Sequence, residues 1–158
     1  MQIFVIHPNP VVCARYLDDR RVGKMCLESA QILSTAMHVQ DYQRPYRTTH
    51  VHHPCVRWAM SSDSNWAWLY EYWYQLIIEW HLRFGRTHGT YTKCWYHFRQ
   101  YRREMSDVEL HTPTDWANVT PYHQWDTFTA YIKHLHGKFL TDKLPAKTTI
   151  GRRYVNES

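Results

Sequence analysis

Residues 65–84 read NWAWLYEYWYQLIIEWHLRF, and this stretch decides the fold class. Large apolar side chains recur along it every three or four residues, at Trp66, Leu69, Trp73, Leu76 and Trp80. This spacing puts them on one face of a helix, which predicts a long amphipathic helix packed on a core. Residues 61–64 supply a break and a cap before it, and Gly85 is a typical residue to end it.

The remaining segments add further helices and little sheet. A helix is predicted from an N-cap at Asp18 or Asp19 to His38, since apolar residues again follow a helical period there. Further helices are predicted over residues 54–60, 92–105 and 125–139, with loops at 40–47 and 106–121. Residues 2–6, which precede the sequence HPNP, predict a short strand or extended segment.

These elements predict a mainly α protein. We expect a compact single-domain helical bundle of about four to six helices, with a short N-terminal strand or extended segment. The domain should span residues 1–158, because no shift in composition marks a second one. Residues 145–158, which include Arg152 and Arg153, are expected to form a flexible basic tail.

The composition favours a binding protein with an anionic partner. The chain has 158 residues, a net charge of +5, 8 Trp and 12 Tyr, so basic groups and amphipathic rings are both plentiful. Its most apolar run, residues 66–80, contains Glu71, Gln75 and Glu79, which argues against a membrane span. The 4 cysteines form no C-x-x-C pair, and reduced thiols in the cytoplasm are therefore expected.

A histidine-rich turn is the first candidate site. Residues 49–58 read THVHHPCVRW, so His50, His52 and His53 crowd a turn stiffened by Pro54. Imidazoles there can donate hydrogen bonds to a phosphate, and a pair of them can supply an acid and a base. A zinc site is not expected, because the usual ligand spacings are missing. A capped turn with exposed imidazoles is an equally good interpretation.

Polar side chains on the two long helices are the second candidate. Arg20, Lys24 and Glu28 follow one side of the first helix, where cations can hold a phosphate and Glu28 or Asp19 can act as a base. On the long helix the corresponding residues are Trp68, Tyr72, Glu79 and Arg83, with His88 beyond its end. The alternative interpretation is ordinary ion pairing between residues four apart, Lys24 with Glu28 and Glu79 with Arg83. For the first helix the spacing alone favours this alternative, and for the long helix both interpretations stay open.

Other common activities lack their sequence signals. No phosphate-binding loop, dinucleotide-binding turn or serine-hydrolase elbow occurs. Arg99, Arg102 and Arg103 lie on a basic helix that could follow a nucleic-acid backbone, although no helix-turn-helix or zinc-finger pattern accompanies them. Trp58, together with residues 68 and 72, remains a candidate for stacking on a base.

The sequence resembles a family of small bacteriophage proteins of largely unassigned function. The residues that carry the resemblance are Ile3-Phe4-Val5, Pro10, Asp19, Val22, Lys24-Met25, Leu27-Glu28, Gln31, His50, His53-Pro54, Trp58, Asn65, Trp68, Arg83, Gly85, His88 and Thr120-Pro121. The family pattern has lysine and histidine where this chain has Arg20 and Arg21, and tyrosine in place of Trp66. The missing histidine weakens any mechanism that needs an imidazole on the first helix. The resemblance implies a phage protein acting in the cytoplasm of the infected cell.

Two functions compete on this basis. The leading prediction is a counter-defence protein that sequesters a nucleotide immune signal, such as a cyclic ADP-ribose isomer or a cyclic dinucleotide. The predicted ligand-binding residues are Arg20, Lys24, Glu28, His50, His53, Trp58, Asn65, Trp68, Tyr72, Glu79, Arg83 and His88. The alternative is a metal-independent enzyme that cleaves a phosphodiester or N-glycosidic bond, with Glu28, Asp19, His50 and His53 as catalytic candidates. A DNA-binding protein is a third hypothesis. No metal or cofactor is expected, and a homo-oligomer remains possible.

Overall fold

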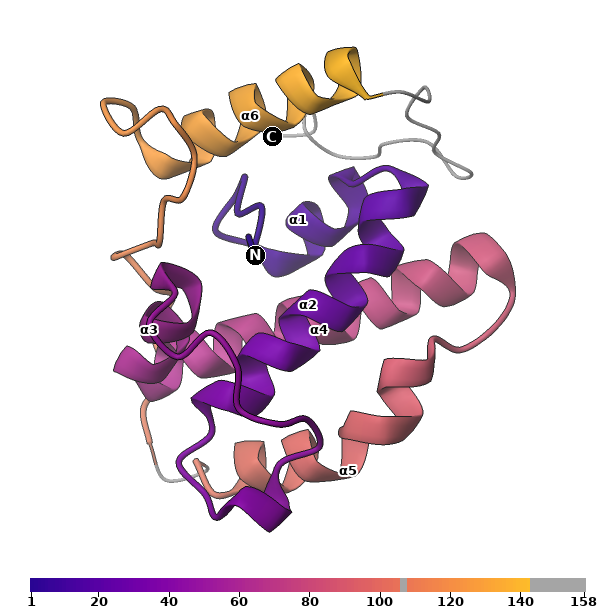
Figure 1. Ribbon diagram of the computed structural model, residues 1–158, viewed down its shortest axis with the longest axis vertical. Coiled ribbons are helices and arrows are strands. Elements are labelled where there is room, and N and C mark those ends of the chain that lie inside the picture. Colours follow the sequence, from indigo (N-terminus) through magenta and orange to yellow (C-terminus); the bar gives the residue numbers. More distant parts are fainter. Residues whose placement is uncertain (106–107, 143–158) are drawn as a thin grey trace.

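Two long helices that cross at the centre of the molecule organise the fold. The computed structural model describes residues 1–105 and 108–142, so the tail predicted at residues 145–158 lies outside the described residues. Figure 1 shows α2 (Asp19–Ala36) crossing α4 (Asp63–Phe84), with α3 (Pro54–Ser61) beside their crossing. The indole N–H of Trp66 on α4 donates to the carbonyl of Leu33 on α2 at 3.1 Å. This bond fixes the register of the two central helices.

Three further helices cover this central pair. The short α1 (Pro10–Tyr16) packs on α4, and α5 (Gly89–Arg103) packs against both long helices from the opposite side. Above α1 and the N-terminal segment lies α6 (Thr127–Thr141), which is joined to them by the contact between the Tyr16 hydroxyl and the His136 ring. The described residues thus form one mainly helical domain with six α-helices and a short 3-10 helix, η1 (Asp41–Gln43), and contain no strand. The predicted fold class is confirmed.

The helix ends follow the capping rules. The Ser62 hydroxyl accepts a hydrogen bond from the N–H of Asn65 at 3.1 Å, and Gly85 ends α4 with a left-handed φ of 69°. Residues 1–6 have no regular secondary structure, so the short strand that the sequence allowed does not form. No helix is predicted where α1 lies, since residues 7–10 indicate only a break. Asn9 in fact caps this helix, and Pro10 is its first residue, a position that tolerates proline.

The close approach of α2 and α4 depends on Gly23. A Cβ atom at this position would lie 2.5 Å from a ring carbon of Trp80. We expect Gly23→Ala to destabilise the fold by about 0.5–2 kcal/mol, because crowding of the indole outweighs the better helix propensity of alanine. Gly137 on α6 has no atom near its Cβ position, so Gly137→Ala should stabilise by about 0.5–1 kcal/mol. Urea unfolding measures the change in unfolding free energy of each variant. A change of the same sign for Gly23→Ala and Gly137→Ala would contradict the role of Gly23.

Among the described residues, no helix is long and apolar enough to cross a lipid bilayer.

Candidate active site

The histidine turn is held against α2 by hydrogen bonds that begin upstream of it. The Arg44 guanidinium donates to the carbonyls of Ser34 and Thr35 at 2.6 and 2.9 Å. The Thr35 hydroxyl accepts from the N–H of Thr49 at 3.2 Å, just before His50. The turn is therefore positioned by the end of the first long helix, although it has no regular secondary structure of its own.

His53 connects this turn to α3. Its Nδ1 atom accepts a hydrogen bond from the N–H of Cys55 at 3.1 Å and so caps the helix. Burial, the charge of the amino terminus and His50 lower the pKa of His53 below its ordinary value of 6.5. Because Nδ1 is an acceptor, the neutral ring carries its proton on Nε2. His53 is therefore a neutral hydrogen-bond donor near pH 7.

The backbone near this site is strained at two residues. His50 and Phe4 have φ values of 52° and 49°, in the left-handed region that non-glycine residues seldom adopt. His50 lies in the histidine turn, whereas Phe4 belongs to the irregular segment that follows the amino terminus. Strain of this kind is often concentrated at functional sites.

Glu28 places a carboxylate where α2, α3 and α4 meet. The pKa of the Cys55 thiol on α3 is raised to about 12, mainly by burial; the charge of the amino terminus acts to lower it and the charge of Glu28 acts to raise it. Burial, followed by several neighbours that include Glu28, also raises the pKa of Tyr72 on α4. Glu28 is partly exposed, and within the described part of the chain it has no hydrogen bond or ion pair, not even with Lys24. Its oxygens are not among the buried side-chain atoms that lack a hydrogen-bond partner, so solvent reaches this carboxylate and a ligand can approach it in the same way.

The amino terminus completes this group of residues. Its positive charge lowers the pKa of both His53 and Cys55, so the terminal amino group lies on the same side of the molecule as the histidine turn. A terminal amino group has no sequence motif and is brought to α3 only by tertiary packing, so it is not among the predicted site residues. We call Glu28, His50, His53 and the amino terminus the carboxylate site.

The other predicted cations lie elsewhere. Arg83 is buried and donates to Glu79, Asp19 and the Leu17 carbonyl at 3.0, 3.1 and 2.7 Å. His88 caps α5 by accepting from the N–H of Thr90 at 3.2 Å. Arg20 is exposed and lies 3.4 Å from the Asp142 carboxylate, and the exposed Lys24 forms no ion pair among the described residues. Arg83 and His88 lie against the first half of α2. On this helix Arg20 lies about two turns before Glu28, and Lys24 about one turn before it.

The aromatic candidates are packed into the core. Trp58, Trp68 and Tyr72 are 5%, 7% and 0% exposed, which leaves no free face for a base. Trp58 stacks on Trp116 with ring centres 5.6 Å apart, and the Trp68 indole donates to the Pro8 carbonyl at 2.7 Å. The buried Asn65 amide donates to the Trp58 carbonyl at 2.8 Å and so joins α3 to α4. Within the described residues, no cluster of three or more His, Cys, Asp or Glu side chains could hold a metal ion.

Three partly buried histidines make stability depend on pH. Burial is the largest cause that lowers the pKa of His53, His88 and His134 below 6.5. Below about pH 6.5 the unfolded chain binds more protons than the folded one, so stability falls as the pH falls through this window. We expect a lower Tm at pH 5 than at pH 7.5 at constant ionic strength, and a smaller difference for His88→Asn, which keeps a capping side chain. A Tm that does not change between these two pH values would contradict the assignment of lowered pKa values to these histidines.

One protein family matches the chain over the segment that contains this site. The family model described as pyrimidine dimer DNA glycosylase matches residues 1–92. The matched segment contains the amino terminus, α1 to α4 and the histidine turn, and hence the whole carboxylate site. No curated protein and no solved structure matches the chain.

This match corrects the leading functional prediction. The leading prediction, capture of a nucleotide immune signal by a counter-defence protein, is wrong, because the matching family is one of DNA glycosylases and favours the enzyme alternative. The structure supplies a physical reason, because the cations expected to gather around a phosphate are divided between a buried ion-pair network, a helix cap and the surface. The resemblance over most of the chain is supported for its first 92 residues. The chain belongs to the pyrimidine dimer DNA glycosylase family.

Proposed function

We propose that this protein is a DNA glycosylase that cleaves the N-glycosidic bond of a pyrimidine dimer in duplex DNA. The observation that carries the proposal is the partly exposed Glu28 carboxylate, which has no partner among the described residues and lies inside the segment that matches the family. The expected reaction is the enzyme alternative of the sequence analysis, without a metal.

Glycosidic cleavage explains why a carboxylate is needed. As the bond from the base to C1′ breaks, positive charge develops on the sugar, and a fixed negative charge beside it stabilises the transition state. A carboxylate can also accept a proton from the attacking nucleophile. Of the two acidic candidates on α2, Asp19 is 3.1 Å from the buried Arg83 guanidinium and is used in the fold. Glu28 is therefore the proposed catalytic carboxylate.

His53 and His50 are the proposed polar partners of the substrate. The His53 ring is neutral near pH 7 and carries its proton on Nε2, so it can donate a hydrogen bond to a base or a phosphate without a net charge. The exposed His50 lies three residues before it. In this proposal the two imidazoles orient the damaged nucleotide, and Glu28 acts on its sugar.

Two kinds of nucleophile fit this site, a water molecule and an amine, and sodium borohydride distinguishes them. An amine that attacks C1′ forms a Schiff base with the opened sugar, which borohydride reduces to a stable protein–DNA adduct. Attack by water gives an abasic site and no adduct. Peptide mapping of any adduct would identify the attacking group directly.

The electrostatics of the chain suit a duplex substrate. A net charge of +5 attracts phosphates, and Lys24 and Arg57 are exposed on the helices that carry the proposed site. Enzymes that act on a base in a duplex must first move it out of the stack, and a damaged base leaves the stack more easily than an intact one. Preference for a dimer is consistent with this energetic difference.

The direct test uses two synthetic duplexes that differ only by one cyclobutane thymine dimer. We expect alkali-labile strand breaks at the dimer and none in the undamaged duplex, both in the presence of a metal chelator. A panel of cyclic and signalling nucleotides, analysed by mass spectrometry after incubation, should show neither tight capture nor conversion. Absence of cleavage at the dimer under conditions where the protein binds the duplex would refute the proposal.

A further inference from the structure

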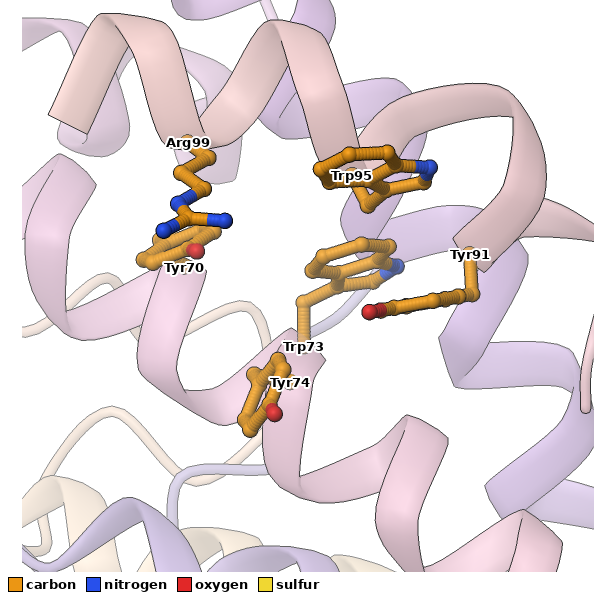
Figure 2. Close-up of a pocket in the computed structure, with 6 residues that line it drawn as sticks. All are labelled: Tyr70, Trp73, Tyr74, Tyr91, Trp95 and Arg99. Carbon is orange, nitrogen blue, oxygen red and sulfur yellow. The ribbon is translucent and has the colours of Figure 1, made fainter.

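A second hollow, lined by aromatic rings, lies between α4 and α5. It has a volume of about 480 Å³ and is lined by Tyr70, Trp73, Tyr74, Tyr91, Trp95 and Arg99. Figure 2 shows these side chains reaching the hollow from both helices, with the Trp73 and Trp95 indoles facing it. A volume of this size is in the range of pockets that hold small organic ligands. We call it the aromatic pocket.

The aromatic pocket is separate from the carboxylate site. On α4, the charge of Glu28 is one of the causes that raise the pKa of Tyr72, whereas Tyr70 and Tyr74 line the aromatic pocket. Residues two positions apart point about 200° from each other around a helix. The two sites therefore lie on opposite sides of α4, and one ligand group cannot occupy both.

Its rings form a nearly parallel series. The Tyr70 and Trp73 planes differ by 29°, those of Trp73 and Tyr91 by 17°, and those of Tyr91 and Trp95 by 20°. Trp95 and Tyr74 remain 38% and 39% exposed, which is high for rings of this size. A flat aromatic ligand can extend this series by stacking, and every nucleobase has a face suited to it.

A buried hydrogen-bond donor stands at the inner wall of the pocket. Trp73 is fully buried, and its indole N–H has no hydrogen-bond partner within the described part of the chain. Buried donors are nearly always paired in native proteins, so this one calls for an acceptor. The edge of a nucleobase carries such acceptors, and a purely apolar ligand does not.

A cation stands at the mouth of the pocket. Arg99 is exposed, its charge lowers the pKa of the Tyr70 phenol against the dominant effect of burial, and Figure 2 shows it directed toward that ring. Glu71 also acts on Tyr70, but its carboxylate accepts a hydrogen bond from the Gln75 amide at 2.9 Å. Proteins commonly bind a nucleotide with aromatic rings that stack on the base and an arginine guanidinium that binds the phosphate.

We infer that the aromatic pocket binds an unpaired nucleotide of single-stranded DNA, with the base stacked on Trp95 and its phosphate at Arg99. Single-stranded nucleic acid is favoured over a peptide, because rings, an orphan donor and a cation together match a base and its phosphate. The inference goes beyond the proposed glycosylase and stands independently of it, since the pocket needs neither a dimer nor Glu28.

The test measures fluorescence anisotropy of a labelled, undamaged oligothymidylate of eight nucleotides at low salt. We expect Trp95→Ala to weaken binding by at least about tenfold, because loss of stacking on one base has effects of this size. Arg99→Ala should weaken it about fivefold or more and reduce the salt dependence by about one charge. The matched controls are Trp125→Ala and Arg103→Ala, an equally exposed tryptophan and an exposed arginine outside the pocket, which should change affinity less than about twofold.

A second probe separates stacking from charge. An oligonucleotide of the same length with abasic residues should bind at least about tenfold more weakly than the thymidylate. Equal binding of the two probes, or equal losses for Trp95→Ala and Trp125→Ala, would overturn the inference and leave only attraction between charges. Failure of wild-type protein to bind the thymidylate would also overturn it. Dimer cleavage by Trp95→Ala, and single-strand binding by Glu28→Gln, are measured in parallel, so the two proposals succeed or fail separately.

Discussion

Replacing Glu28 by glutamine is expected to abolish cleavage of dimer-containing DNA while leaving binding of the same duplex within about twofold of wild type. The amide has the size of the carboxylate but no charge, so it can neither stabilise positive charge on the sugar nor accept a proton. Removal of one such electrostatic group typically costs about 10²- to 10³-fold in rate, and removal of a general base about 10²- to 10⁴-fold. Single-turnover cleavage with excess protein measures the chemical step directly.

The matched control for this variant is Glu104→Gln, an exposed carboxylate that follows α5. It makes the same change in net charge far from the proposed site, and we expect its single-turnover rate to stay within about twofold of wild type, as for other surface substitutions. Equal loss of activity in both variants would assign the effect to net charge. Full activity of Glu28→Gln would remove Glu28 from the mechanism and with it the main support for the proposed site.

The local sequence was enough to predict most of the fold. Apolar residues at helical spacing located α2 and α4, and Gly85 was correctly predicted to end α4. The error at α1 arose because Pro10 has two meanings, a break inside an element and a favourable first residue of a helix. Only the Asn9 side chain, whose oxygen accepts from the N–H of Val11 at 2.9 Å, distinguishes them.

The candidate site was less predictable because its geometry depends on distant contacts. Spacing alone made Lys24–Glu28 and Glu79–Arg83 equivalent ion pairs, yet the structure forms only the second among its described residues. The difference comes from Asp19 and the Leu17 carbonyl, which reach Arg83 from more than 60 positions away. For the same reason the sequence could not choose between Glu28 and Asp19 as the catalytic carboxylate.

The Arg83 network leads to the second large effect, on stability. The Arg83 and Glu79 side chains are 0% and 2% exposed, and the Asp19 side chain is 17% exposed. We expect Arg83→Met to lower the free energy of unfolding by about 3–5 kcal/mol, because breaking the buried ion pair leaves the Glu79 carboxylate buried without its cation. For a chain of this size the loss corresponds to a Tm lower by roughly 6–20 °C. Urea unfolding and calorimetry measure the two quantities.

Two further variants separate this structural role from the phosphate clamp that the sequence also allowed. Combining Arg83→Met with Glu79→Gln should recover part of the loss, because the buried negative charge is then gone as well. Arg83→Lys should recover less of the lost stability than this double variant does. An ammonium group cannot reproduce the separate bonds from Nε and Nη1 of Arg83 to Glu79 and Leu17. A change in unfolding free energy below about 1 kcal/mol for Arg83→Met, within the ordinary range of single substitutions, combined with weaker duplex binding would contradict the structural role. That result would support a role of Arg83 in binding DNA.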